Sequence, residues 1–135
     1  MTMTTPATQA APFGLSQIGQ IAVNAYDTDR AIAFYRDTLG MRFLFQAGPL
    51  GFFDCGGVRL MLSPAESPEF DHPGSILYYK VTDIQATHQT LAARGVTFSG
   101  EPHVIHRTPQ YDLWMAFFRD SEGNTLALMC EQPKA

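Results

Sequence analysis

Residues 113–131, LWMAFFRDSEGNTLALMCE, consist of two apolar runs joined by the polar segment 119–124. The first run is rich in aromatic residues and the second in aliphatic ones. Gly123 lies in the connecting segment, and glycine readily adopts the positive φ angles that tight turns require. The pattern predicts a β-hairpin.

A shorter copy of this hairpin pattern occurs at residues 51–62, GFFDCGGVRLML. Both copies contain a Phe-Phe pair, a turn glycine, and a leucine three residues after that glycine, Leu60 in the first copy and Leu126 in the second. The position after this leucine is occupied by Met61 and Ala127. The repetition indicates two structurally equivalent units.

The segments before each hairpin repeat in the same order. In the first unit the pattern predicts strands at 18–24 and 41–46, a helix at 28–39 capped by Asp27, and hairpin strands at 52–54 and 58–63. In the second it predicts strands at 75–81 and 96–99, a strand or loop at 103–107, and a helix at 84–94 capped by Asp83. Each unit is therefore a β-α-β-β-β module, and two such modules pack together because neither buries its apolar faces alone.

These boundaries define the predicted organisation of the chain. We expect an N-terminal arm at 1–16 and a single domain at 17–131, divided into module one (17–64), a linker rich in proline (65–73) and module two (74–131).

Composition excludes several classes of protein. The net charge of −4 argues against a nucleic-acid partner, which normally requires a clustered basic surface. No apolar run approaches the roughly 20 residues of a membrane span, and the N-terminus lacks the pattern of a secretory signal. Cys55 and Cys130 lack the spacing of a metal-binding or redox motif; a disulfide is one option, and a reduced pair in the cytoplasm is the expectation.

Two motifs resemble one known family. The segment 27–41, DTDRAIAFYRDTLGM, resembles the D-x-x-x-S-x-x-F-Y-x-x-x-L-G-M signature of the vicinal oxygen chelate superfamily, which includes glyoxalase I, bleomycin-resistance proteins and extradiol dioxygenases. The segment 118–124, FRDSEGN, resembles the F-x-D-P-x-G-N turn of that family, with Ser121 where proline is usual. The resemblance implies an α+β fold of paired βαβββ modules, whose curved, cup-like mixed sheets carry their helices outside.

The resemblance also implies where a metal ion would bind. In metal-dependent members each module supplies two ligands, usually His, Glu or Gln, from equivalent strand positions. In this chain the corresponding positions are Gln20, Ile76, Met61 and Ala127. Only Gln20 is a usable ligand, and a single amide oxygen does not hold a divalent cation against water. We therefore predict no metal cofactor; a divalent metal bound through other positions is the alternative.

The remaining candidate residues belong to a mixed polar and apolar lining, which is typical of small-molecule pockets. The predicted ligand-binding residues are Gln20, Asn24, Arg59, Met61, Tyr78, Lys80, Trp114 and Ala127. Arg59 and Lys80 could receive an anionic group, although cations at strand ends commonly just reach solvent. Trp114 could stack on a planar group, and packing in the core or at a dimer interface is the alternative.

Histidine chemistry is the other candidate. His103 and His106 are three residues apart, so in an extended strand they point to opposite faces and do not form a metal pair. His103 is the favoured catalytic residue, as a general acid or base.

These observations lead to two principal functional hypotheses. The first is a small-molecule-binding protein that acts without a metal ion, with its ligand in a cup or at a homodimer interface. The second is a lyase, isomerase or dioxygenase that uses a rearranged metal site or His103. A dimeric interaction module is a third option.

Overall fold

The computed structural model describes residues 13–134, so most of the predicted N-terminal arm lies outside the described residues. The first sheet has the strand order β1-β4-β3-β2. Its strands are β1 (Gln20–Asn24), β2 (Arg42–Ala47), β3 (Leu50–Cys55) and β4 (Val58–Ser63). β1 runs parallel to β4, while the other neighbours are antiparallel.

The second sheet repeats this topology, with the order β5-β8-β7-β6. Its strands are β5 (Leu77–Lys80), β6 (His103–Arg107), β7 (Tyr111–Arg119) and β8 (Thr125–Pro133). β5 is parallel to β8, and β8, β7 and β6 are antiparallel. The predicted α+β class and the paired βαβββ modules are confirmed.

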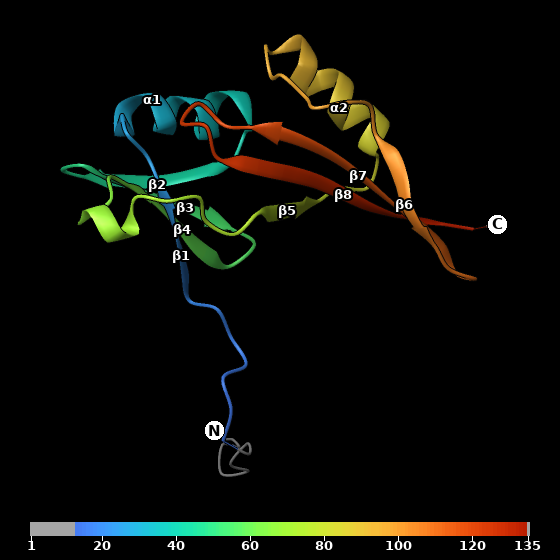
Figure 1. The fold of residues 1–135 in the computed structure, drawn as a ribbon, viewed down its shortest axis with the longest axis horizontal. Coiled ribbons are helices and arrows are strands. Elements are labelled where there is room, and N and C mark those ends of the chain that lie inside the picture. The colour runs from blue at the N-terminus through green and yellow to red at the C-terminus, as the bar shows by residue number, and fades with distance from the viewer. Residues whose placement is uncertain (1–12, 135) are drawn as a thin grey trace, which may run out of the picture.

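Two helical segments lie on the same side of the molecule, above the two sheets (Figure 1). The first is α1 (Thr28–Ala33), which continues as the π-helix η1 (Phe34–Thr38), and the second is α2 (Ile84–Ala93). The side chains of Asp27 and Asp83 cap these helices by accepting hydrogen bonds from the N–H groups of Arg30 and Ala86. A short 3-10 helix, η2 (Pro68–Phe70), lies in the linker between the modules.

Most predicted elements differ from the structure only by a few residues at their ends, but two differ in kind. The predicted helix 28–39 is α-helical only to Ala33, after which its hydrogen bonds widen to the π pattern, as in the bond from the Leu39 N–H to the Phe34 carbonyl. The predicted strand 96–99 is reduced to an isolated bridge between Phe98 and Phe118.

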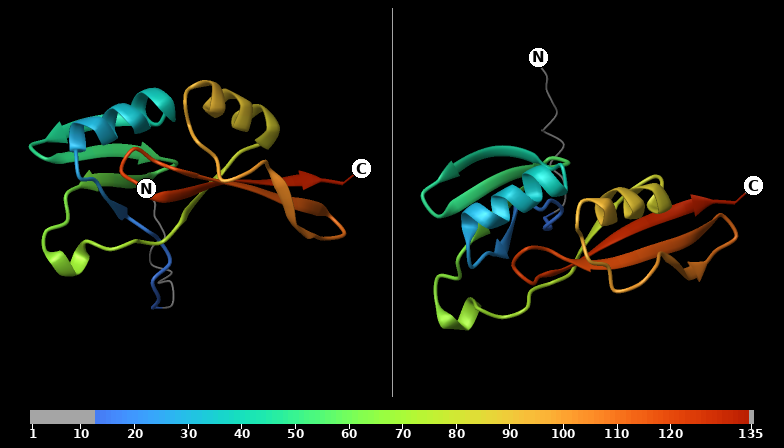
Figure 2. Two further views of the ribbon diagram at one scale, coloured as in Figure 1. Left: turned by 45° about the horizontal axis from the view of Figure 1, so that its top comes forward. Right: turned by 90° about the horizontal axis from the view of Figure 1, so that it is seen from above.

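The core lies between the helices and the sheet faces beneath them (Figure 2). Tyr35, Phe53 and Phe118 are among its largest fully buried side chains. Gly51 allows α1 to approach β3 closely, because a Cβ atom at this position would lie 2.7 Å from Cγ1 of Ile32. A glycine is therefore required at this contact between helix and sheet.

The β7–β8 turn of module two docks onto α1 of module one. The buried carboxylate of Asp120 accepts hydrogen bonds from the hydroxyl of Tyr35 at 2.7 Å and from the backbone N–H groups of Glu122 and Asn124. Glu122 accepts two hydrogen bonds from the guanidinium of Arg30, at 2.8 and 3.1 Å. The turn thus joins segments 85 to 95 residues apart through charged and polar contacts.

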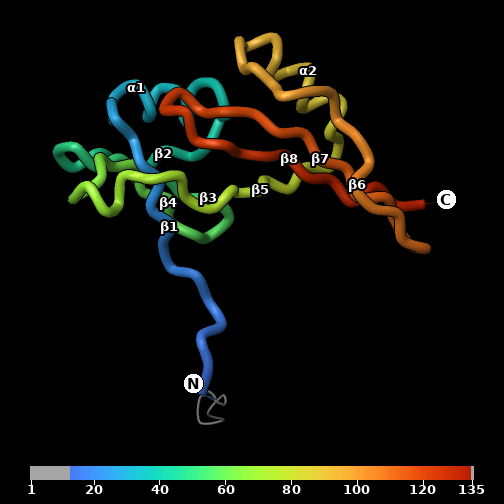
Figure 3. The backbone as a smooth tube through the Cα atoms, in the orientation of Figure 1, coloured from blue at the N-terminus to red at the C-terminus, as the bar shows by residue number. Residues whose placement is uncertain are grey.

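The chain ends and the cysteines complete the description. Residues 13–19 lead away from the first sheet (Figure 3). Cys55 and Cys130 are both free thiols, the first half-buried and the second buried. Among residues 13–134, no helix combines the length and apolar character needed to cross a membrane.

Candidate functional site

Among residues 13–134, no α-helix covers the face of the first sheet opposite α1 and η1 (Figure 2), and we call this face the open face of sheet one. The parallel register places Gln20 opposite Arg59, Ala22 opposite Met61, and Asn24 opposite Ser63. The intervening residues of β1 and β4 point to the other face, toward the core. The predicted lining residues of module one therefore share a single surface.

The open face of sheet one carries an ordered cation beside an aromatic pair. The guanidinium of Arg59 donates from Nε to the side-chain oxygen of Gln20 at 2.7 Å, and its Cζ lies 5.2 Å from the ring centroid of Phe52. Phe52 in turn stacks on Phe45 at 4.6 Å, and Phe45 remains 48% exposed. This arrangement holds the guanidinium in one place, where it can pair with a planar anionic group.

Arg59 also differs from most other cations in its electrostatic surroundings. Among residues 13–134, no carboxylate lies within 4.0 Å of its guanidinium, whereas the ammonium of Lys80 pairs with Glu131 at 3.9 Å. The charge of Arg59 is therefore available to a ligand, while that of Lys80 is partly compensated.

The open face of sheet two is formed by the equivalent positions of module two. Tyr78 lies opposite Ala127, and Ala127 lies opposite Phe117 on the next strand. The rings of Tyr78 and Phe117 meet edge to face at 6.0 Å, and Ala127 has no exposed surface. Tyr78 can contact a ligand, but Ala127 supports the surface rather than lining it.

Two other predicted ligand-binding residues have structural contacts in place of a ligand. Trp114 pairs with Cys130 and packs against the core on the helix side of the second sheet, so it does not reach the open face. The amide of Asn24 donates to the carbonyl of Phe70 at 2.9 Å. Asn24 therefore lies on the open face but holds the linker in place.

The two histidines of β6 do not alternate as the sequence suggested. The register shifts between Val104 and His106, leaving Ile105 as an extra residue in a β-bulge. His103 consequently pairs with Met115, and His106 pairs with Leu113. Because Met115 and Leu113 are two residues apart on β7, both histidines lie on the open face of sheet two. The prediction of opposite faces was wrong, because it assumed an unbroken two-residue period.

His103 has a defined tautomer in the neutral state. Its Nδ1 lies 3.0 Å from the carbonyl oxygen of Glu101, and a carbonyl can only accept, so Nδ1 carries the proton. The other ring nitrogen, Nε2, is then free to act as a base.

The side chains at the four positions where the resemblance predicts metal ligands are a poor donor set for a metal ion. Met61 and Ala127 offer a thioether and a methyl group, and Ile76 is an aliphatic residue. The amide oxygen of Gln20 already accepts from the guanidinium of Arg59, whose positive charge opposes a second cation at the same atom. Among residues 13–134, no group of three or more His, Cys, Asp or Glu side chains is arranged to hold a metal ion.

Comparison with known proteins assigns the family. Residues 17–128 match the family model described as the glyoxalase/bleomycin resistance protein/dioxygenase superfamily. The chain belongs to this superfamily. The resemblance of segments 27–41 and 118–124 to its motifs is thereby confirmed.

Members of the superfamily with several different descriptions are similar to this chain. A glyoxylase-like domain-containing protein from Didymella fabae is 30% identical over 132 residues, covering 87% of this chain and 94% of that protein. The crystal structure of TnmS3, an antibiotic-binding protein from Streptomyces sp. CB03234, superposes with a TM-score of 0.68 at 27% identity, covering 91% of this chain and all of that one. A lactoylglutathione lyase from Agrobacterium tumefaciens gives a TM-score of 0.65 at 25% identity, covering 87% and 95% of the two chains.

The sequence pattern did not assign Phe45 or Phe52 to the site, and it gave Phe117 only as one of several aromatic residues around the second cup. Phe52 and Phe117 both belong to Phe-Phe pairs in which one ring faces the core and the other the open face. That alternation could have been read from the strand period. The position of Phe45 could not, because a bulge at Leu44 shifts the register between Phe43 and Phe45.

Proposed function

We propose that the open faces bind a small organic molecule that combines an aromatic ring with an anionic group, and that they do so without a metal ion. The observation that carries the proposal is the guanidinium of Arg59, oriented by Gln20, placed over Phe52 and free of a carboxylate partner among residues 13–134. Affinity would come from the Phe45–Phe52 surface and orientation from the guanidinium.

The similarity to TnmS3 supports binding rather than catalysis as the principal role, since that relative is described as an antibiotic-binding protein. The donor set at the positions of the family's metal ligands supports the same proposal, because it offers no more than one hard ligand. The role of the protein would then be sequestration of its ligand.

We also propose that a second copy of the chain completes the binding cup. Apolar side chains remain exposed on the open faces, as shown by Phe45 at 48% and Tyr78 at 44%, and β1 and β5 each pair with one strand only among the described residues. A homodimer would cover these surfaces. Light scattering should give twice the chain mass of 14.9 kDa, and the monomer mass at micromolar concentration would contradict this.

The two free thiols support a reducing, cytoplasmic location.

The binding proposal is tested by titrating the protein with 2-naphthoate in a calorimeter. Replacing Arg59 by methionine keeps an unbranched side chain but removes the charge, and should weaken 2-naphthoate binding about tenfold, since a charge-assisted hydrogen bond contributes about 1.5–3 kcal/mol. Binding of the neutral analogue 2-naphthamide should change less than about twofold.

Arg94→Met is the matched control for this titration. Arg94 follows α2 on the helix side and donates to the carbonyl of Thr38, so its loss removes one exposed cation without touching the open face. Equal affinities for 2-naphthoate in the Arg59 and Arg94 variants would contradict the assignment of the anion site.

One observation favours an enzymatic role as the second candidate. His103 lies on the open face of sheet two with Nε2 free, as a general acid or base requires. We would test turnover of lactoylglutathione, the compound that the Agrobacterium tumefaciens relative is named for. Turnover that is lost in His103→Gln would establish this role, and no turnover by the wild-type protein would remove that substrate.

A further inference from the structure

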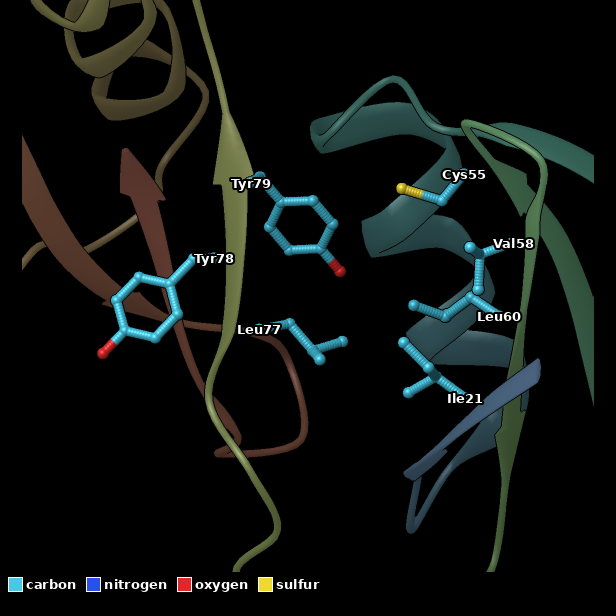
Figure 4. Close-up of a pocket in the computed structure, with 7 residues that line it drawn as sticks. All are labelled: Ile21, Cys55, Val58, Leu60, Leu77, Tyr78 and Tyr79. Atoms are coloured by element: carbon cyan, nitrogen blue, oxygen red, sulfur yellow. The ribbon is translucent and has the colours of Figure 1, made fainter. Parts of the chain in front are cut away.

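A cavity lies between the two modules. Its volume is about 190 Å³. β5 forms one wall and the strands β1, β3 and β4 form the other (Figure 4). It is lined by Ile21, Cys55, Val58, Leu60, Leu77, Tyr78 and Tyr79, and Tyr78 also belongs to the open face of sheet two. Ile21 and Leu60 lie on the helix side of the first sheet, opposite to the face that carries Arg59.

The cavity contains one orphaned polar group. The hydroxyl oxygen of Tyr79 is buried and has no hydrogen-bond partner among the described protein atoms. The hydroxyl points toward the side of the cavity formed by Cys55 and Leu60, whereas Tyr78 points to the other side of β5 (Figure 4). Buried hydroxyl groups are normally satisfied, so an orphaned one directed into a cavity indicates a group that pairs with a ligand.

We propose that this cavity is a second binding site, which takes a neutral, monocyclic molecule with one hydrogen-bond acceptor, such as a cyclic ketone. The acceptor would receive the hydroxyl proton of Tyr79 while the ring fills the space between Leu60 and Leu77. An apolar cavity of about 150 Å³ in another protein holds one benzene ring, so this volume suits a six-membered ring with a single substituent. No charged side chain lines the cavity, and a charged ligand would lose its hydration without compensation.

The polar groups of the cavity remain neutral over the ordinary pH range. Burial raises the pKa of the Tyr79 hydroxyl far above its usual value, with smaller contributions from Cys55 and Asp120. Burial is the main cause that raises the pKa of the Cys55 thiol, and the negative charge of Asp54 raises it further. Tyr79 is therefore a permanent donor, and Cys55 is a slow nucleophile that suits a non-covalent site.

The test is an NMR titration of the full chain with two probes of similar size, cyclohexanone and benzene. Cyclohexanone should produce saturable shifts at the backbone amides of Cys55 and Leu77. In Tyr79→Phe, the affinity for cyclohexanone should fall about tenfold while that for benzene is retained. The melting temperature of this variant should equal or exceed that of the wild type, because the substitution removes an unsatisfied hydroxyl.

Tyr26→Phe is the control, since Tyr26 is exposed and its hydroxyl binds Asp71 outside the cavity. It should leave both affinities unchanged. In the wild-type protein, saturating cyclohexanone should slow alkylation of Cys55 by iodoacetamide several-fold and leave the affinity for 2-naphthoate unchanged, which separates this site from the open face.

Three results would overturn the proposal. The first is the absence of saturable shifts at the cavity, and the second is equal cyclohexanone affinity in Tyr79→Phe and the wild type. The third is a rate of Cys55 alkylation that decreases as the protein concentration is raised in the absence of cyclohexanone. Such a decrease would show that a second copy of the chain covers the cavity.

Discussion

Replacing Asp120 by alanine should lower the free energy of unfolding by about 3–5 kcal/mol, the largest effect expected of any single substitution considered for this chain. Asp120 as a whole residue is 7% exposed. Its carboxylate accepts hydrogen bonds from the Tyr35 hydroxyl, from the N–H groups of Glu122 and Asn124, and from the Asn124 side-chain amide. Removal of the carboxylate leaves several buried donors without an acceptor. Each of these donors then lacks the hydrogen bond that it makes to water in the unfolded chain. Urea unfolding measures the effect.

Two other substitutions give reference values for the loss of stability in Asp120→Ala. Asp83→Ala removes a single N-cap hydrogen bond and should cost about 1 kcal/mol. Tyr35→Phe removes one of the four bonds to Asp120 and should cost about 1–2 kcal/mol. If Asp120→Ala cost no more than Asp83→Ala, the turn would not be what joins the modules.

Acid should weaken the same junction through Glu122. Burial alone would raise the pKa of this carboxyl, but the hydrogen bonds from Arg30, from the Asp27 N–H and from Ser121, together with the charge of Arg30, lower the pKa to about 2 from an ordinary 4.5. The folded protein therefore binds a proton at Glu122 less readily than the unfolded chain. The stabilisation is complete above about pH 4.5 and is lost as the pH falls toward 2.

The size of this effect follows from the shift in pKa. A difference of about 2.5 units corresponds to about 3 kcal/mol at neutral pH, and solvent screening of the half-exposed Arg30 reduces this to about 2–3 kcal/mol. Glu122→Gln should lose that amount at pH 7, and its difference from the wild type should vanish near pH 2. Urea unfolding at a series of pH values provides the measurement.

Asp37→Asn is the control for the acid experiment. Asp37 also pairs with an arginine, Arg36, but both side chains are exposed, so the pair should contribute almost nothing to stability. A constant difference between Glu122→Gln and the wild type from pH 7 to pH 2 would contradict the role given to the Glu122 carboxylate.

Much of the fold could be predicted from the sequence because its signals are local. The capping side chains of Asp27 and Asp83 mark the starts of the two helices. The two hairpins are recognisable from apolar runs on either side of turn glycines. Counting from those glycines also put Arg59 and Met61 in one predicted lining with Gln20, and the parallel register of β1 with β4 places these residues on one face. The shared face of Gln20, Arg59 and Met61 was therefore predictable.

What could not be predicted depends on contacts between distant segments or on broken periods. The bulges at Leu44 and Ile105 move Phe45 and His106 to faces that a regular two-residue period does not give. The carboxylates in segment 120–122 were recognisable as parts of a turn, but their partners Tyr35 and Arg30 lie far away in sequence. Trp114 was a candidate to stack on a ligand, with core packing as an alternative, and its strand position directs it to the core.

The central claim is that the open face of sheet one binds its ligand through side chains alone. It is tested most directly by one measurement, the dissociation constant for 2-naphthoate in wild-type protein dialysed against a chelator and then against Ni²⁺, Zn²⁺ or Mn²⁺. We predict the same constant in every case, with less than about one tenth of an ion bound per chain, since Gln20 is the one usable ligand among the positions that correspond to the family's metal ligands. Binding that appears only with a metal, at about one tightly held ion per chain, would contradict the claim.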